Sequence, residues 1–206
     1  MTNQLSFSVD SFLNNKEIEQ VLKFYKNLQK TLHNEEGTKV YTTGFVWQDH
    51  LYFSKVLNER LKPYLQGSKV TLSYVLEEHT PLSVHTDFFN HNDPNPGRVF
   101  LIPLMFKGTS ENASTVVFNE LGNTEKWRES LKVIQYPYSK TEKKMLTHIN
   151  EDLIKKISPL RIHDWQPGKL IVWDRKLLHC SDNFLENGVT SKTALVIFSA
   201  YDTNES

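Results

Sequence analysis

Two short segments that lie far apart in the chain hold the residues best suited to chemistry. Residues 83–87 contain a His-x-Asp pair, His85 and Asp87, and residues 168–179 form a Gly-led apolar stretch that leads to His179. Side chains two apart on a strand point to the same face, so His85 and Asp87 can act together. With one His from a neighbouring strand they give two imidazoles and one carboxylate. That set can occupy one face of an octahedral metal and leave about three positions open, as in non-heme Fe(II) sites.

A second His-x-Asp pair, His91 and Asp93, shows that the pattern also arises by chance. It lies within residues 90–97, a stretch rich in Asn and Pro that reads as a loop, where the spacing imposes no common face. His85 and Asp87 instead lie among apolar residues that can hold them rigidly. We therefore assign the ligand role to the first pair.

The third ligand has three candidates among the later histidines. His148 lies in a charged stretch, His163 lies in an expected strand, and His179 follows the Gly-led strand and an Asp-Arg-Lys turn. A lone His is more often a hydrogen-bonded structural residue than a ligand. Spacing by itself leaves the three candidates open.

Composition argues against several classes of protein. The 206 residues suit one domain, residues 1–206, and the 24 Lys and Arg balance the 24 Asp and Glu, which argues against a nucleic-acid partner. The single cysteine, Cys180, excludes an intrachain disulfide and a Cys-rich zinc site. We find neither a signal-peptide pattern nor an apolar run of about 18 residues, so we expect no membrane association and a cytoplasmic location.

Hydrophobic periodicity predicts two helices near the N-terminus, at residues 14–32 and 50–65, with a strand at 40–47 between them. Asn14, with Glu17 three residues later, is a plausible capping pair for the first helix.

Beyond these helices the chain reads as short apolar strands separated by turn residues, a pattern typical of an antiparallel sandwich or barrel. Strands are expected at residues 72–76, 84–89, 99–106, 115–118, 160–165, 169–173 and 192–200. We therefore expect a mainly β fold with flanking helices, in which the N-terminal helices cover one sheet.

Residues 120–158 interrupt this pattern with a charged segment of helices and loops. Such an insertion acts either as a lid over a binding site or as a solvated outer layer. Trp127 within it is the aromatic residue that we expect to contact a substrate.

The order of these motifs resembles the 2-oxoglutarate- and Fe(II)-dependent dioxygenases, in particular prolyl-hydroxylase-like and phytanoyl-CoA-hydroxylase-like members. In that family a His-x-Asp pair comes first, a Gly-led strand leading to the second His comes later, and a strand that opens with a basic residue follows. Residues 82–87, 168–179 and 192–199 match in that order, and residues 9–17 look like the start of the family's first helix. The insertion has no counterpart in this resemblance.

The resemblance implies a double-stranded β-helix, or jelly roll, with Fe(II) bound by His85, Asp87 and His179. It also implies 2-oxoglutarate and O2 as co-substrates, with the keto acid chelating the iron and the far carboxylate meeting the basic residue. That residue is usually Arg, but Lys192 stands at the expected position. Arg98 is a second candidate.

A Lys is a point charge rather than a bidentate fork, so a carboxylate held by Lys192 would need helpers. Tyr74, Thr193 or Ser191 would supply a hydroxyl.

The resemblance further implies hydroxylation of an unactivated C–H bond, with release of succinate and CO2. The carboxylate of Asp87 favours this or a related oxidation over halogenation. The substrate would be a small molecule or a peptidyl side chain. Phe88 follows the ligand pair and would wall the pocket, whereas Arg175 would orient a ligand or substrate carboxylate or face water.

Two other classes of function use the same fold. One is a jelly-roll protein with a different metal that acts as an isomerase or hydrolase. The other is a non-enzymatic binding module that uses the charged insertion as its interaction surface.

Overall fold

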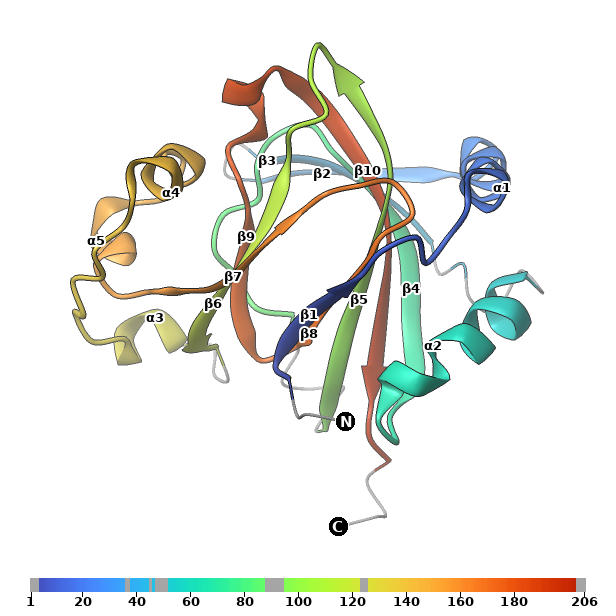
Figure 1. Cartoon of the computed structure of the whole chain (residues 1–206), viewed down its shortest axis with the longest axis horizontal. Helices are drawn as coiled ribbons and strands as arrows, with labels where there is room; N and C mark the ends of the chain where they lie inside the picture. Colours follow the sequence, from blue (N-terminus) through green and yellow to red (C-terminus); the bar gives the residue numbers. More distant parts are fainter. Residues whose placement is uncertain are drawn as a thin grey trace.

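Two antiparallel sheets form the core of the molecule (Figure 1). The computed structural model describes residues 4–35, 38–44, 46, 52–87, 95–122 and 126–202. The larger sheet has the strand order β1-β8-β5-β10-β4-β3-β2, and the smaller has the order β7-β6-β9. The expected mainly β jelly-roll fold is therefore confirmed.

The strands of the larger sheet are β1 (Ser6–Val9), β2 (Lys30–Glu35), β3 (Thr38–Thr43), β4 (Lys69–Glu78), β5 (Pro96–Gly108), β8 (Leu170–Asp174) and β10 (Val189–Ala200). Those of the smaller sheet are β6 (Ser114–Leu121), β7 (Pro159–Asp164) and β9 (Leu177–Ser181).

Strand β10 lies in the middle of the larger sheet and separates two hydrophobic clusters. Leu195 and Ile197 face outward, towards the N-terminal helices, whereas Ala194 and Val196 face inward, towards the smaller sheet. This alternation follows from the pleat of a strand, which sends successive side chains to opposite faces. Because both faces of β10 are covered, its sequence reads as a nearly continuous apolar run.

Two helices cover the outer face of the larger sheet, as the sequence predicts. Helix α1 (Asn15–Lys26) buries Ile18, Val21 and Tyr25. It begins with the expected capping box between Asn14 and Glu17. Helix α2 (Asn58–Leu65) continues from a π-helical segment, η1 (Tyr52–Leu57), and buries Leu61 and Leu65 in the same cluster.

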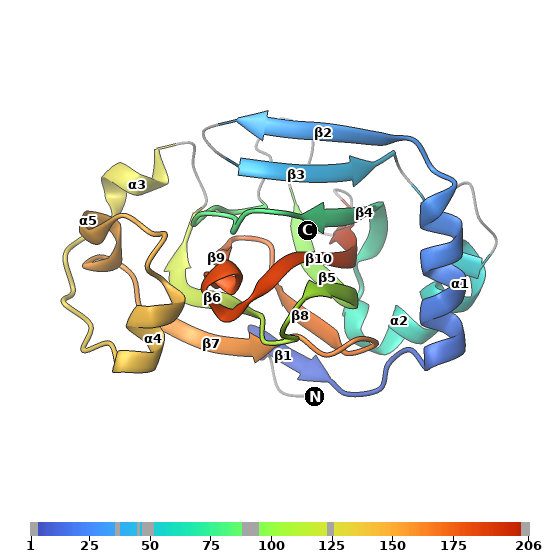
Figure 2. The same ribbon diagram turned by 90° about the horizontal axis from the view of Figure 1, so that it is seen from above.

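The first predicted helix is too long. Helix α1 ends at Lys26, and from Lys30 the chain forms strand β2, which pairs with β3 along its full length (Figure 2). Leu32, which fits the helical pattern, is 46% exposed on this hairpin. Strand pairing, which a local helical period does not report, decides the conformation of this segment.

Other boundaries also differ from the prediction. The expected strand at 84–89 is a single bridge at His85 within the part of it that the structure describes. The expected start of the second helix lies partly outside the described residues, and Val56 is 41% exposed although the pattern placed it on the buried face. Strand β1 was not predicted; it pairs with β8 at the edge of the larger sheet.

The insertion covers the outer face of the smaller sheet. Its helices are α3 (Trp127–Ser130), α4 (Lys140–Met145) and α5 (Glu151–Ile154), which lie at the opposite end of the molecule from α1 (Figures 1 and 2). Residues of the insertion, including Trp127 at 7% exposure, pack with Val116 and Phe118 of β6 in a third hydrophobic cluster. Among the described helices, none has the length and hydropathy of a membrane span.

Gly168 is required where the chain turns into β8 beneath the start of α1. Its φ of +82° lies in the left-handed region, and an added Cβ would lie 2.3 Å from the Leu13 carbonyl oxygen. The carbonyl oxygen of Gly168 accepts a hydrogen bond from the Leu13 N–H at 2.9 Å. Gly168 therefore permits the close approach that joins the first helix to the sheet.

We expect Gly168→Ala to lower the free energy of unfolding by about 2–5 kcal/mol, because the backbone strain adds to the steric overlap between the new Cβ and the Leu13 carbonyl oxygen. The matched control is Gly67→Ala, since Gly67 has a similar φ of +88° but no atom within 4 Å of an added Cβ. Gly67→Ala should lower the free energy of unfolding by about 1–2 kcal/mol. Urea unfolding of both variants measures the difference, and equal losses would contradict the role of the close approach.

Candidate metal centre

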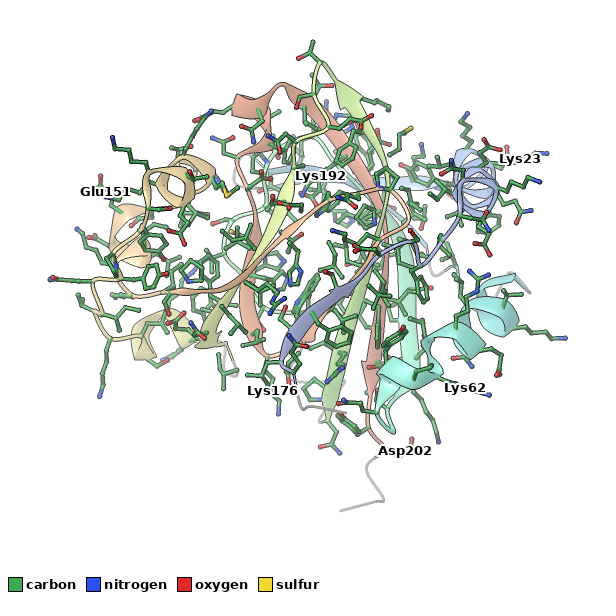
Figure 3. The ribbon with its side chains drawn as sticks, viewed as in Figure 1. Lys23, Lys62, Glu151, Lys176, Lys192 and Asp202 are labelled. Atoms are coloured by element: carbon green, nitrogen blue, oxygen red, sulfur yellow. The ribbon has the colours of Figure 1, made fainter. Side chains whose placement is uncertain are left out.

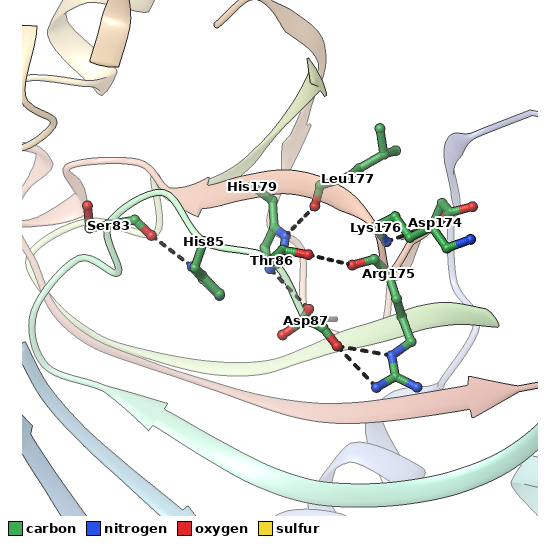
Figure 4. Close-up of polar contacts among 9 residues, drawn as sticks. All are labelled: Ser83, His85, Thr86, Asp87, Asp174, Arg175, Lys176, Leu177 and His179. Atoms are coloured by element: carbon green, nitrogen blue, oxygen red, sulfur yellow. Dashed lines mark hydrogen bonds and ion pairs between the residues drawn. The ribbon is translucent and has the colours of Figure 1, made fainter. Parts of the chain in front are cut away.

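A short backbone pairing brings the two chemistry-bearing segments together. The N–H of His85 donates to the carbonyl oxygen of His179, and the N–H of His179 donates to that of His85, both at 3.0 Å. The two imidazole rings lie with their centroids 4.2 Å apart (Figure 4). These bonds fix His85, which follows β4 in the chain, against strand β9.

Asp87 completes a group of three potential ligands. The ligand atoms of His85, Asp87 and His179 all lie within 4.8 Å of one another, and His179 Nε2 lies 3.1 Å from Asp87 Oδ2. Within the described part of the chain, no other set of three or more His, Cys, Asp or Glu side chains is arranged in this way. Of the three candidates for the distal His, the structure brings His179 to the pair.

Two other histidines are occupied elsewhere. His163 Nε2 lies 2.7 Å from the Ser6 hydroxyl, and His148 Nε2 lies 3.4 Å from the Leu82 carbonyl oxygen. Both have the hydrogen-bonded structural role that is commonest for a lone His.

The hydrogen bonds of the two rings orient their free nitrogens. His85 Nδ1 lies 2.8 Å from the Ser83 carbonyl oxygen, and His179 Nδ1 lies 3.1 Å from that of Leu177. A carbonyl only accepts, so each Nδ1 carries the proton and each Nε2 is the available ligand atom. Two such nitrogens and one carboxylate oxygen suit a divalent transition metal such as iron, and the chemistry of the donor set therefore fits.

Burial and mutual charge set the protonation of this group. Burial, helped by the nearby His179, lowers the pKa of His85 to about 4. Burial alone would lower the pKa of His179, but the charge of Asp87 and a hydrogen bond to it raise that pKa above its ordinary value. Burial alone would raise the pKa of Asp87, but His179 holds it below its ordinary value. Before a metal binds, His179 and Asp87 thus behave as an ion pair.

Arg175 holds the ligand segment in place from behind. Its Nε and Nη2 donate to the Asp87 carbonyl oxygen at 3.3 and 3.1 Å (Figure 4). Its Nη1 donates to the Ser199 carbonyl oxygen at 3.1 Å. The guanidinium lies over the ring of Phe198, and the residue is only 2% exposed. The expectation that Arg175 faces water is wrong, because its guanidinium donates hydrogen bonds to buried carbonyl oxygens. Arg175 is also not among the residues that line the cavity described below. Arg175 therefore positions the backbone of Asp87, one of the three candidate metal ligands.

A cavity of about 720 Å³ opens from the metal centre. Tyr74 and Glu78 of β4 line its inner part, together with Ser181 of β9. The β2–β3 hairpin contributes a wall that includes His33 and Thr42, whose side chains lie 2.7 Å apart. None of the described residues of the insertion lines this cavity.

Lys192 lies inside the barrel, behind the lining residues Glu78 and Ser181. Its ammonium lies 3.4 Å from Glu78 Oε2 and donates to the Ser181 hydroxyl at 3.1 Å. It also lies over the ring of Trp165, 3.9 Å from the centroid. In Figure 3 Lys192 is in the interior, whereas Lys23 and the other labelled charged residues lie at the periphery.

Two further residues expected near the co-substrate lie on the opposite face of the sheet. Thr193 is opposite Glu77 and on the outward face of β10, because neighbours on a strand alternate. Arg98 also points outward, and its Nη2 donates to the Gln66 side chain at 2.6 Å. Neither lines the cavity, whereas Tyr74 lines it directly and Lys192 lies behind two lining residues, Glu78 and Ser181.

The expected substrate residues are placed less favourably. Trp127 is buried between the rest of the insertion and the smaller sheet, and it is not among the residues that line the cavity. Phe88, and the second His-x-Asp pair at His91 and Asp93, lie outside the described residues.

Sequence reasoning missed Glu78 and Ser181. Glu77 and Glu78 follow one another at the end of β4, where two acidic residues read as a solvated strand end. The usable signal was the apolar run before them, since its alternation sends Leu76 and Glu78 to the same, inward face.

Comparisons with known proteins show the fold. No family model and no curated protein sequence matches this chain. The epimerase SnoN from nogalamycin biosynthesis, in complex with Fe3+ and alpha ketoglutarate, has a TM-score of 0.65 at 8% identity over 97% of this chain and 80% of that chain. HygX from Streptomyces hygroscopicus, with nickel and 2-oxoglutarate bound, gives 0.63 at 11% identity over 97% and 84%. The viral collagen prolyl hydroxylase of Paramecium Bursaria Chlorella virus-1 gives 0.53 at 13% identity over 97% and 98%. The chain has the fold of these 2-oxoglutarate-dependent enzymes.

We expect Arg175→Met to weaken metal binding by roughly 10–100-fold, because groups that orient metal ligands typically contribute that much. Titration with Co(II), followed calorimetrically, measures the change. Lys176→Met is the control, since it removes a neighbouring positive charge that does not contact the ligand segment. Equal affinities in the two variants would show that Arg175 does not position Asp87.

Metal binding should weaken as the pH falls through the raised pKa of His179. A metal needs the neutral imidazole, so below that pKa each binding event releases close to one proton, and affinity falls by up to about tenfold per pH unit. His85 and Asp87 add little near neutral pH, because the pKa values of both are lowered. Calorimetry at pH 6 in two buffers of different ionisation enthalpy counts the protons, and the absence of release there would contradict the ion pair.

Proposed function

We propose that this chain is a single-domain Fe(II)- and 2-oxoglutarate-dependent oxygenase. The observation that carries the proposal is the group of His85, Asp87 and His179 inside a jelly roll, on a cavity that is also lined by Glu78, the partner of a buried lysine. The three side chains would hold the metal on one face and leave the other face for the keto acid and O2. Bound iron with these co-substrates supplies oxidation of a C–H bond, with release of succinate and CO2.

The residues of the chain would orient and shield these groups. Lys192 and Ser181 would receive the far carboxylate of 2-oxoglutarate at the base of the cavity. Burial, followed by the charges of Asp87 and Glu78, raises the pKa of Tyr74, so its phenol stays neutral and can donate a hydrogen bond. Trp173 packs against the His179 ring with centroids 4.9 Å apart and limits its movement.

The proposed reaction is hydroxylation of a small molecule or of a peptidyl side chain. The fold neighbours include an epimerase, a carbocyclase and a prolyl hydroxylase, so the same fold accommodates several outcomes. The β2–β3 hairpin lines the cavity with the hydroxyls of Thr38, Thr42 and Thr43 beside His33, and with the apolar Val40. Such a wall favours a substrate that is recognised by neutral hydrogen bonds.

The test is anaerobic addition of Fe(II) and then 2-oxoglutarate to the whole chain, with the visible spectrum recorded. A 2-oxo acid chelated to Fe(II) gives a weak charge-transfer band. We expect this band in the native protein, its loss in His179→Ala and its weakening in Lys192→Met. His163→Ala is the control, because it also removes a buried imidazole but from outside the metal centre.

Two results would overturn the proposal. Iron binding without the band would favour a metalloprotein with isomerase or hydrolase chemistry. A protein that binds neither iron nor 2-oxoglutarate would be a binding module, and His85→Ala would then leave its biological activity intact.

A further inference from the structure

The candidate co-substrate lysine already has a carboxylate partner. Lys192 and Glu78 lie directly opposite each other on β10 and β4. Their side chains are 0% and 3% exposed, and Lys192 Nζ lies 3.4 Å from Glu78 Oε2. The Ser181 hydroxyl bridges them, since it donates to Glu78 and accepts from Lys192. The three groups form a closed polar unit inside the barrel.

From the cavity, a ligand meets Glu78 before it meets Lys192. Glu78 and Ser181 line the cavity, whereas Lys192 does not. The aromatic rings of Trp165 and Phe184 cover the ammonium, with centroids 3.9 and 5.1 Å from Nζ. A carboxylate that approaches Lys192 must therefore come close to the carboxylate of Glu78.

The charges at this point do not favour a second anion. Two carboxylates beside one ammonium leave a net negative charge in a site that water reaches poorly, where like charges repel strongly. Asp182, which is 1% exposed, adds a further carboxyl group near Lys192. For 2-oxoglutarate to use Lys192, Glu78 has to release it.

Stability alone gives a weak reason for such a pair. A buried ion pair is often no more stabilising than apolar residues of the same volume, because both charges lose their hydration. The pair nevertheless lies at the end of the cavity that leads from the metal centre. This position points to a role in selecting what binds there.

We propose that Glu78 is a specificity-determining residue that holds Lys192 in place of the co-substrate and sets the affinity of the site for the far carboxylate of 2-oxoglutarate. The inference rests on the proposed function, because it takes Lys192 as the group that receives this carboxylate. Release of Lys192 by Glu78 is then a condition of co-substrate binding, and the charge of Glu78 opposes it.

The adjacent Glu77 provides a matched control. It is also buried, at 6% exposure, but points to the outer face of β4. There it accepts hydrogen bonds from the Tyr25 hydroxyl at 2.6 Å and from Lys107 at 2.8 Å. Glu77→Gln removes the same charge one residue away without touching the cavity.

The experiment measures dissociation constants by calorimetry on the Mn(II)-loaded whole chain. The two probes are 2-oxoglutarate and 2-oxopentanoate, a 2-oxo acid of equal length that lacks the far carboxylate. We expect Glu78→Gln to bind 2-oxoglutarate at least about tenfold more tightly than the native chain and 2-oxopentanoate equally well. Glu77→Gln should change neither constant. Glu78→Asp, which keeps the charge but withdraws it from Lys192, should give an intermediate gain and serves if Glu78→Gln fails to fold.

The outcomes separate this inference from the proposed function. The inference is supported if Glu78→Gln binds 2-oxoglutarate more tightly than the native chain does, or if the variant binds it and the native chain does not. Equal or weaker binding by the variant overturns it and leaves the proposed function standing. A chain that binds Mn(II) but whose native and Glu78→Gln forms both fail to bind 2-oxoglutarate overturns both.

Discussion

The reciprocal backbone hydrogen bonds between His85 and His179 are the constraint on which the site depends. Strand β9 is an edge strand of the smaller sheet, paired on its other side with β6. The short segment after β4 satisfies its free edge and so links the two sheets. Because paired residues place their side chains on a common face, the same bonds that close the edge also set the two imidazoles side by side. Asp87 follows within reach, and Arg175 fixes its backbone.

Two internally paired groups of charges lie among the residues that line the cavity or lie directly behind them. One is the metal centre, where His179 and Asp87 balance each other. The other is the unit of Lys192, Glu78 and Ser181 at the base of the cavity. Buried charges persist only when they are paired or bind a ligand, so both groups have a stable form without ligand and a reason to exchange partners when one arrives. The cavity is lined by members of both groups.

The parts of the fold outside the barrel have separate roles. Helices α1 and α2 stabilise the larger sheet by covering its outer face, and Gly168 allows the close contact at the start of α1. The insertion does the same for the smaller sheet, through a cluster that includes Trp127 and Phe118. The β2–β3 hairpin instead contributes part of the cavity wall. An Fe(II) oxygenase built in this way would change its substrate through the hairpin without disturbing its core.

The sequence by itself determined the inner strands, the N-terminal helices and the residue types of the metal centre, because alternation and helical periodicity are local properties of the chain. It also placed Lys192 in the last strand, although this strand begins at Val189 rather than at Lys192. Tertiary structure decided what local patterns do not contain. Pairing across the sheet made a strand of residues 30–35, and pairing between sheets selected His179 over His148 and His163. The pleat sent Thr193 outward and Glu78 inward, and cross-strand register set Glu78 against Lys192, because contacts between distant strands depend on register and not on sequence spacing.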